Sequence, residues 1–205
     1  MYLLAVCLAS YLYGSIPFGL ALGKARGVDV RQHGSGRTGA ANTLRTLGLG
    51  ASAVAFAGDF SKGVVAVVLA RVFTGSPAAE AIAAMFAVAG HNWSAFIGFR
   101  GGRGVAASVG AVALMFPPAV GVGVVVFACV LAASRYVSLA SIIASASVPV
   151  ALAPMVLMGI APAEYLAFSI VAAVLIILQH KDNLERLRAG AERRLGEKAE
   201  RKAGP

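Results

Sequence analysis

The sequence predicts an all-α membrane protein, a polytopic bundle of about seven transmembrane helices with short or broken members. Of the 205 residues, 59% are hydrophobic and 13% are charged, and the mean hydropathy is +0.80. These values lie far outside the range of a soluble domain. Apolar runs recur at roughly the 20-residue length that a helix needs to cross a bilayer. The lipid bilayer is therefore an expected partner.

The basic residues, which give a net charge of +9, form short clusters between the apolar runs. Cytoplasmic loops beside anionic lipid have this pattern. The charge is therefore assigned to the membrane surface, and nucleic acid is not an expected partner.

The first three predicted spans are simple apolar runs. Tyr2–Leu22 lacks the basic n-region of a cleaved signal peptide and is long enough to cross, so it is expected to remain as a membrane helix. Leu49–Phe73 is the second span, although Asp59 and Lys62 interrupt it, and Pro77–Ile97 is the third.

The C-terminal half contributes four more predicted spans. Val105–Ser134 is too long for one helix, and the pair Pro117-Pro118 divides it, so two short helices are expected there. Leu139–Met158 is the sixth span, kinked around two internal prolines, and Ala163–Gln179 is the seventh.

Threading the chain through seven crossings places nearly all basic residues on one side. With the N-terminus outside, the outer side receives only Arg71, Glu80 and Glu164 among the charged groups. The positive-inside rule therefore predicts an outer N-terminus and a cytoplasmic C-terminus. A five-helix arrangement with re-entrant pieces is the alternative.

The chain is expected to form one integral membrane domain over residues 1–183, followed by a basic cytoplasmic tail over residues 184–205. Cys7 and Cys129 lie inside apolar runs and have neither metal-ligand nor disulfide spacing. Neither a metal nor a cofactor is expected.

Gly34–Arg45 gathers glycines, hydroxyls and arginines in one polar segment. The glycines allow successive backbone N–H groups to converge on an anion. The side chains add neutral hydrogen-bonding groups and guanidinium forks suited to phosphate. A basic connecting loop is the alternative. The residues expected to bind or act are Gly34, Ser35, Gly36, Gly39, Asn42 and Arg45. Arg37 lies in the same segment, and contact with substrate and contact with lipid alone are both open for it.

Asp59 and Lys62 lie three residues apart inside the second predicted span, so they share a helix face. An ionisable side chain at membrane depth costs roughly 2.5 to 3.5 kcal/mol on insertion scales. Each therefore needs a partner or a function. A self-paired structural role and contact with a substrate are both open.

A third cluster begins at His91 and Asn92 and continues through Gly101, Gly102, Arg103 and Gly104, directly before the fourth span. The backbone N–H groups and the positive N-terminus of that helix would face the same anion. A tight turn explains the glycines but not the arginines, and His91 alone is typical of a packed histidine.

Two further clusters lie at helix ends. Ser138 and Ser141 begin the sixth span, where hydroxyls cap a helix or bind a ligand. His180 and Asn183 follow the seventh span and share a face, and Glu192 is placed to support a nearby arginine or backbone donor.

All five clusters fall on the cytoplasmic side of the seven-span topology. The orientation of that topology was assigned from charge alone. We therefore expect one shared site, rich in anion-binding donors and open to the bilayer. Such a site suits a substrate that carries phosphate and a lipid tail.

At these residues the chain resembles the PlsY family, bacterial membrane acyltransferases that use acyl phosphate to acylate glycerol 3-phosphate. The resemblance covers almost the whole chain and depends on several motifs in one order. They are Gly-Ser-Ile-Pro-Phe-Gly at 14–19, the segment 34–45, Asp-x-x-Lys-Gly at 59–63, Gly-His-Asn with the glycine cluster at 90–106, Arg-Tyr-Val-Ser-Leu-Ala-Ser at 135–141, and His-x-x-Asn-x-x-Arg-Leu at 180–187 with Gly190 and Glu192.

The resemblance implies catalytic roles for Ser35, Arg45, His180 and Asn183. It implies substrate binding by Gly34, Gly36, Gly39, Asn42, Lys62, His91, Asn92, Gly101, Gly102, Arg103, Gly104, Ser138 and Ser141, and structural roles for Asp59 and Glu192. The chain departs from the family pattern at two positions, because the family usually has asparagine in place of Arg37 and lysine in place of Arg103.

The resemblance further implies the reaction. The 1-hydroxyl of glycerol 3-phosphate would attack acyl phosphate, giving 1-acylglycerol 3-phosphate and inorganic phosphate, at a site facing the cytoplasm from the bacterial inner membrane. His180, His91 and a substrate phosphate are open as the base. A soluble enzyme that makes acyl phosphate is a further partner to be considered. The rival class is a transporter or channel for small phosphorylated anions, which also uses arginines near broken helices.

Overall fold

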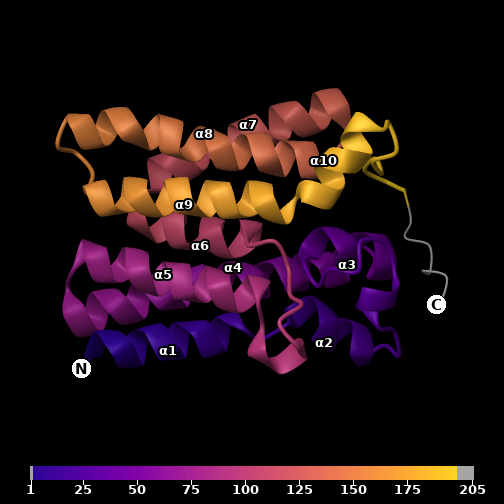
Figure 1. Ribbon diagram of the computed structural model, residues 1–205, viewed down its shortest axis with the longest axis horizontal. Coiled ribbons are helices and arrows are strands. Elements are labelled where there is room, and N and C mark those ends of the chain that lie inside the picture. The colour runs from indigo at the N-terminus through magenta and orange to yellow at the C-terminus, as the bar shows by residue number, and fades with distance from the viewer. Residues whose placement is uncertain (1, 198–205) are drawn as a thin grey trace.

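The computed structural model describes residues 2–197, and within them it contains helices and no strand (Figure 1). The last eight residues of the predicted tail, 198–205, lie outside the described residues. The α-helices are α1 Tyr2–Gly14, α2 Phe18–Lys24, α3 Ala40–Leu47, α4 Leu49–Thr74, α5 Pro77–Asn92, α6 Val105–Met115, α7 Pro117–Ser134, α8 Val137–Leu157, α9 Ala163–Gln179 and α10 Lys181–Arg188, with short 3₁₀ turns η1 Val30–Gln32 and η2 Ala95–Ile97.

The long helices run side by side in a bundle (Figure 1). Helices α1, α4 and α5 form one group and α7, α8 and α9 another, and α6 lies between them and contacts members of both. The short helices α2, α3 and α10 gather at the same end of the bundle as the C-terminus. The polar clusters of the sequence lie at this end.

Helices α4 and α6 pack closely because glycines remove side chains from their contact. A Cβ atom at Gly63 would overlap the backbone of Ala107, and one at Gly110 would overlap the carbonyl oxygen of Phe60. Small residues allow such close helix packing inside membranes. The contact holds α6, whose first turn belongs to the site, against α4.

The predicted spans correspond to helices, but the first is divided. Tyr2–Leu22 was expected to form one helix, whereas α1 ends at Gly14 and α2 begins at Phe18. The predicted break at Pro117 is confirmed, since α6 ends at Met115 and α7 begins at Pro117. By length and apolar composition, four segments of the described chain qualify as membrane spans, the first of them α1 and α2 together, or five if α9 and α10 form one bent span. The number of crossings and the side on which each terminus lies stay predictions.

Two predictions about local structure are corrected. The segment 34–45 was expected to be a loop, but Ala40–Leu47 forms α3, because Gly39 begins the helix with an extended backbone and the following alanines favour it. The third span ends at Asn92 instead of Ile97. There the chain turns away, because the Ser94 hydroxyl donates to the carbonyl oxygen of Ser15 at 2.5 Å.

A buried carboxylate ties the other end of the bundle together. Glu80 accepts two hydrogen bonds from Arg71, at 2.8 and 2.9 Å, and one from the Tyr165 hydroxyl at 2.8 Å. Arg71 also donates to the carbonyl oxygen of Leu114. The network therefore joins α4, α5, α6 and α9 at the end of α5 opposite His91.

We expect Glu80→Ala to lower the free energy of unfolding by about 3 kcal/mol, because it leaves two donors without their buried acceptor. Thermal unfolding of the purified protein in detergent measures the loss. Tyr165→Phe, which removes one hydrogen bond, should cost only about 1 kcal/mol. Equal stability of the Glu80 variant and the parent would contradict this role.

Candidate active site

A polar cavity of about 430 Å³ opens at the end of the bundle where α3 and α10 lie. It brings together residues from all five sequence clusters. The predicted residues that line it are Ser35, Gly39, Asn42, Arg45, Asp59, His91, Arg103, Gly104, Ser138, Ser141, His180, Asn183 and Glu192. Within the described part of the chain, the predicted residues that do not line it are Gly34, Gly36, Lys62, Asn92, Gly101 and Gly102.

Four helices start at the cavity wall. The first residues of α3, α6 and α8 line it, as do His180 and Asn183 at the start of α10. Each of these four helices, within residues 2–197, begins without a side-chain hydrogen bond to its free N–H groups. Helix N-termini carry partial positive charge and exposed donors. Their convergence makes the cavity suited to anions.

Three arginines add full positive charge to the same wall, two from the segment 34–45 and one from the segment before α6. They are Arg37, Arg45 and Arg103. Arg45 donates to the carbonyl oxygen of Arg193 at 3.3 Å, and Arg103 to that of Gln179 at 3.1 Å. Burial lowers the pKa of the Arg45 guanidinium. Burial, with the nearby charges of Arg37 and Arg186, lowers the pKa of Arg103 to about 10. Both arginines are still charged at neutral pH.

Glu192 organises the α8 and α10 side of the cavity. Its Oε1 accepts from the Ser138 hydroxyl at 2.8 Å and from the Asn183 amide at 2.7 Å, and its Oε2 accepts from Arg186 at 2.8 Å. Burial favours a raised pKa for this carboxyl, but these hydrogen bonds outweigh it and hold the pKa below its usual value. Glu192 is therefore an ionised support, as the sequence suggested.

The amide of Asn183 is oriented by this contact. Because Nδ2 donates to Glu192, the carbonyl oxygen Oδ1 is left to face other groups. His180 is oriented in a similar way, since its Nδ1 lies 2.7 Å from the carbonyl oxygen of Ile176. Nδ1 must carry the proton in that bond, so Nε2 of the neutral ring is a proton acceptor.

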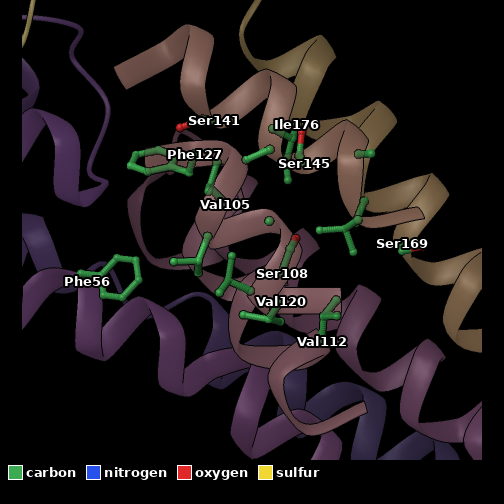
Figure 2. Close-up of a pocket in the computed structure, with 17 residues that line it drawn as sticks. Phe56, Val105, Ser108, Val112, Val120, Phe127, Ser141, Ser145, Ser169 and Ile176 are labelled. Atoms are coloured by element: carbon green, nitrogen blue, oxygen red, sulfur yellow. The ribbon is translucent and has the colours of Figure 1, made fainter. Parts of the chain in front are cut away.

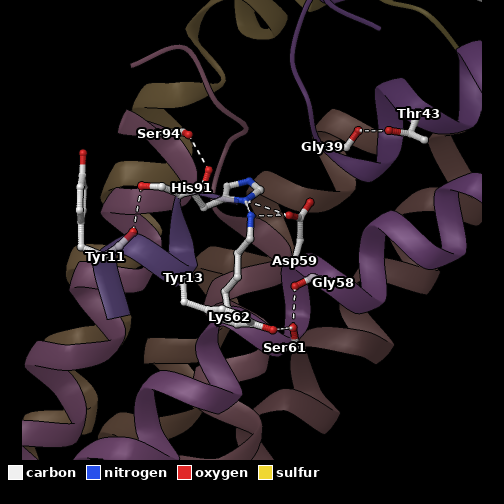
Figure 3. Close-up of polar contacts among 11 residues, drawn as sticks. Tyr11, Tyr13, Gly39, Thr43, Gly58, Asp59, Ser61, Lys62, His91 and Ser94 are labelled. Carbon is white, nitrogen blue, oxygen red and sulfur yellow. Dashed lines mark hydrogen bonds and ion pairs between the residues drawn. The ribbon is translucent and has the colours of Figure 1, made fainter. Parts of the chain in front are cut away.

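Asp59, Lys62 and His91 form a second buried cluster (Figure 3). The Lys62 Nζ lies 2.7 Å from Asp59 Oδ1 and 3.1 Å from His91 Nδ1. Of the two roles left open by the sequence, the structure shows the pairing of Asp59 with Lys62. Asp59 and His91 line the cavity, whereas Lys62 does not and contacts both of them.

Several polar atoms of the cavity wall are not used within the protein. In the described chain, Nη2 of Arg103, Oδ1 of Asn183 and Oδ2 of Asp59 are buried and have no hydrogen-bond partner. Buried polar atoms are nearly always hydrogen-bonded. A donor and two acceptors of this kind around one cavity indicate a binding site for a polar ligand. Among residues 2–197, no group of three His, Cys, Asp or Glu side chains is placed to hold a metal ion.

The segment from Gly101 to Gly104 is held against the end of α5. The N–H groups of Gly101 and Gly102 donate to the carbonyl oxygens of Asn92 and His91, at 3.0 and 2.9 Å. A Cβ atom at Gly102 would overlap the His91 ring. Gly104, with φ +84°, adopts a left-handed conformation before α6. The glycines therefore shape the backbone beside Arg103, which carries the side chain that reaches the cavity.

A family model described as glycerol-3-phosphate acyltransferase matches residues 4–190. The chain belongs to the glycerol-3-phosphate acyltransferase family. Glycerol-3-phosphate acyltransferase 2 of Moorella thermoacetica is 44% identical over 200 residues, which cover 97% of this chain and 100% of that relative. The glycerol-3-phosphate acyltransferase of Desulforudis audaxviator is 41% identical over 186 residues, which cover 90% of this chain and 91% of that relative.

Two solved structures share the fold. The crystal structure of PlsY, an integral membrane glycerol 3-phosphate acyltransferase, in its glycerol 3-phosphate form is 36% identical, with a TM-score of 0.88 over 95% of this chain and 96% of that one. The lysophosphatidic acid form gives a TM-score of 0.86 at 36% identity, over 95% of each chain. The resemblance to the PlsY family and the all-α membrane fold are confirmed.

Sequence reasoning missed part of the site. Arg37 was left without a role, yet it lines the cavity. Arg186 stood in the motif at 180–187 without a role of its own, and the structure shows that it is the arginine that Glu192 binds. The apolar wall, which includes Phe56, Phe127 and Leu131, carries no motif at all.

Proposed function

We propose that the protein transfers an acyl group from acyl phosphate to the 1-hydroxyl of glycerol 3-phosphate. The hydroxyl oxygen bonds to the acyl carbonyl carbon, and the bond from that carbon to the phosphate oxygen breaks. The products are 1-acylglycerol 3-phosphate (lysophosphatidic acid) and inorganic phosphate, and the hydroxyl proton leaves with the base or the phosphate. This is a first step of phospholipid synthesis, and we place it on the cytoplasmic side of the bacterial inner membrane.

The observation that carries the proposal is the joining of two cavities of opposite character. The polar cavity shares Phe56, Val105, Phe127 and Ser141 with an apolar cavity of about 200 Å³ between α6, α7, α8 and α9 (Figure 2). A substrate with a charged head and a hydrocarbon tail fits this pair. The acyl phosphate head would lie in the polar cavity and its chain in the apolar one.

The two phosphates are assigned to different arginines. Ser35, which precedes α3, and Arg45, in the last turn of α3, would hold the acyl phosphate. Arg103 and the N–H groups at the start of α6 would hold glycerol 3-phosphate. Phosphate is a good leaving group, so the protein contributes mainly by positioning two anions, offsetting their repulsion and stabilising the charge that develops on the carbonyl oxygen.

His180 is the protein base that the geometry favours. Its Nε2 is the proton acceptor of a buried ring that lines the cavity. His91 differs, because its Nδ1 lies 3.1 Å from the Lys62 ammonium. An Nδ1 that accepts this hydrogen bond leaves the proton of the neutral ring on Nε2, which then cannot act as a base. The carbonyl oxygen of Asn183, one turn along, would accept a hydrogen bond from the substrate hydroxyl or a protonated phosphate oxygen.

Gly102→Ala should lower kcat/KM for glycerol 3-phosphate roughly a hundredfold, because the added methyl overlaps the His91 ring and displaces the neighbouring Arg103. Steady-state kinetics with glycerol 3-phosphate as the varied substrate checks this. Gly50→Ala is the matched control, since no atom of the described chain lies within 4 Å of the added Cβ. Equal kinetics of the two variants would contradict the assignment.

Gly123→Leu should make the enzyme select shorter acyl chains. Gly123 lines the apolar cavity, and a Cβ there already lies 3.1 Å from the Val148 side chain, so a leucine would fill the space that the chain needs. We expect kcat/KM for long-chain acyl phosphates to fall roughly tenfold or more, while short chains are spared.

The control for the chain-length prediction is Gly121→Leu, two residues away on the exposed side of α7. In the described structure no atom lies within 4 Å of a Cβ at Gly121. Loss of activity on all chain lengths in both variants would show damage to the helix and would count against the apolar cavity as the chain site.

The proposed donor is tested with the purified protein, glycerol 3-phosphate and one donor at a time. Acyl phosphate should give acylglycerol 3-phosphate and inorganic phosphate in equal amounts. Neither acyl-CoA nor the acylated form of acyl carrier protein should give either product. Product formation from acyl-CoA alone would overturn the proposal. A soluble enzyme that makes acyl phosphate is a proposed partner, because the donor must be supplied at this face.

A further inference from the structure

The segment between α5 and α6 forms a closed loop whose neck belongs to the site. We call residues 93–100 the aromatic loop. Its neck is closed where the N–H groups of Gly101 and Gly102 donate to the carbonyl oxygens of Asn92 and His91. A loop whose ends lie together and whose middle projects outward is a compact unit. The neck lies directly before Arg103 in the chain.

The outer part of this loop exposes three large aromatic side chains. Trp93, Phe96 and Phe99 are 41%, 58% and 60% exposed, and Arg100 beside them is exposed as well. Phe99 has φ +60°, a left-handed backbone that residues with a large side chain rarely adopt. In Figure 1 the loop extends away from the bundle beside α1 and α2.

The loop is held firmly while it exposes these side chains. Ser94 is 1% exposed and donates to the carbonyl oxygen of Ser15 at 2.5 Å. The Tyr11 hydroxyl donates to the carbonyl oxygen of Trp93 at 2.8 Å, and the N–H of Phe99 donates to that of Ser94 at 2.8 Å. These bonds fasten the loop to the end of α1 and fix the direction in which its aromatic side chains point.

The surroundings of the loop indicate what covers it. Helix α1 belongs to a candidate membrane span and exposes Leu4, Leu8 and Leu12. With a spacing of four residues, these side chains form one apolar stripe along the helix. The stripe runs toward Ser15, where the loop is fastened. Tryptophan and arginine at the end of a spanning helix are typical of the membrane interface, and Trp93 and Arg100 have this placement, with Phe96 and Phe99 as apolar side chains between them.

We propose that the aromatic loop inserts into the lipid interface at the end of the spans and thereby holds the neck, with Arg103 and the His91 backbone, in its binding geometry. The occupant of this surface is the bilayer. The insertion does not depend on the proposed function, whereas the effect on glycerol 3-phosphate rests on it. The bilayer would then act as a positioning element for the phosphate site.

Trp93 is the single tryptophan of the chain, so its fluorescence measures insertion directly. The full-length protein is reconstituted into phosphatidylcholine vesicles whose acyl chains are brominated either near the headgroup or near the chain end. We expect strong quenching by bromine near the headgroup, weaker quenching by bromine at the chain end, and little quenching by aqueous iodide. Full quenching by iodide with none by brominated lipid would overturn the insertion, and this holds whatever the protein catalyses.

The coupling to the site is tested with Phe96→Ser/Phe99→Ser. In vesicles this variant should raise KM for glycerol 3-phosphate about fivefold, because a loop that no longer inserts into lipid does not hold the neck in its binding geometry, and binding must restore that geometry. KM for acyl phosphate should not change. The control Leu157→Ser/Met158→Ser removes two exposed apolar side chains at the far end of α8. Unchanged KM for glycerol 3-phosphate, or an equal rise in the control, would overturn the coupling.

Discussion

Arg45→Ala is expected to lose most of the acyl transfer activity while the bundle stays folded. Arg45 lines the cavity from the last turn of α3, and its guanidinium makes a single hydrogen bond to the protein, to the carbonyl oxygen of Arg193, among the described residues. Its remaining N–H groups are available to phosphate. Removing a charged donor aimed at the reacting group typically costs roughly a hundred- to a thousandfold in rate. Steady-state kinetics measure the loss of activity, and thermal unfolding in detergent shows whether the bundle stays folded.

The matched control is Arg26→Ala. Arg26 lies at the same end of the molecule, donates weakly to the carbonyl oxygen of Leu47 at 3.4 Å and does not line the cavity, within the residues that the structure describes. Arg45→Lys should recover only part of the lost rate, because an ammonium group lacks the planar fork. An Arg45→Ala enzyme as active as Arg26→Ala would remove Arg45 from the site.

Glu192→Ala should lose both stability and activity. The carboxylate is the shared acceptor of Ser138, Asn183 and Arg186, so its removal leaves buried donors unsatisfied. We expect the free energy of unfolding to fall by about 3 kcal/mol. The activity of the remaining folded protein should also fall, because the Asn183 amide is no longer oriented. Unfolding curves and kinetics at a temperature where the variant is folded measure both effects.

The pH dependence of stability adds a second test of Glu192. Its folded pKa lies below the ordinary 4.5. Its contribution is therefore complete above about pH 4.5 and is lost as the pH falls through the folded value. In Glu192→Gln, this part of the loss of stability on acidification should be absent. In the control Glu197→Gln, which changes an exposed carboxylate, the loss of stability should be the same as in the parent. Identical acid curves for the parent and Glu192→Gln would contradict the role of the carboxylate.

The sequence allowed the bundle to be predicted where a helix boundary had a local cause. Pro117 ends one helix and begins another, and α9 begins and ends at the predicted residues. The site was predicted by a different route. Basic and glycine-rich clusters that are far apart in the chain were placed on one side by charge alone, and Ser35, Arg103 and Asn183 do line one cavity.

The features of the site that the sequence did not predict depend on three-dimensional packing. Lys62 was expected to contact substrate, but its Nζ is directed at Asp59 and His91 and its side chain is almost fully buried. Sequence spacing predicts the pair but not the side of the helix that faces a cavity. The apolar cavity between α6 and α9 is formed by ordinary core residues such as Val112 and Ala172, and only the packing of the helices reveals it.

The most direct test of the account follows the oxygen that leaves with the phosphate. The protein is reconstituted into vesicles with glycerol 3-phosphate and an acyl phosphate that carries a heavy oxygen isotope between its carbonyl carbon and phosphorus. Attack at the carbonyl carbon predicts that all of this label appears in inorganic phosphate, with one phosphate released per lysophosphatidic acid formed. Label retained in the acyl product, or glycerol 3-phosphate that crosses the vesicle membrane chemically unchanged, would contradict it.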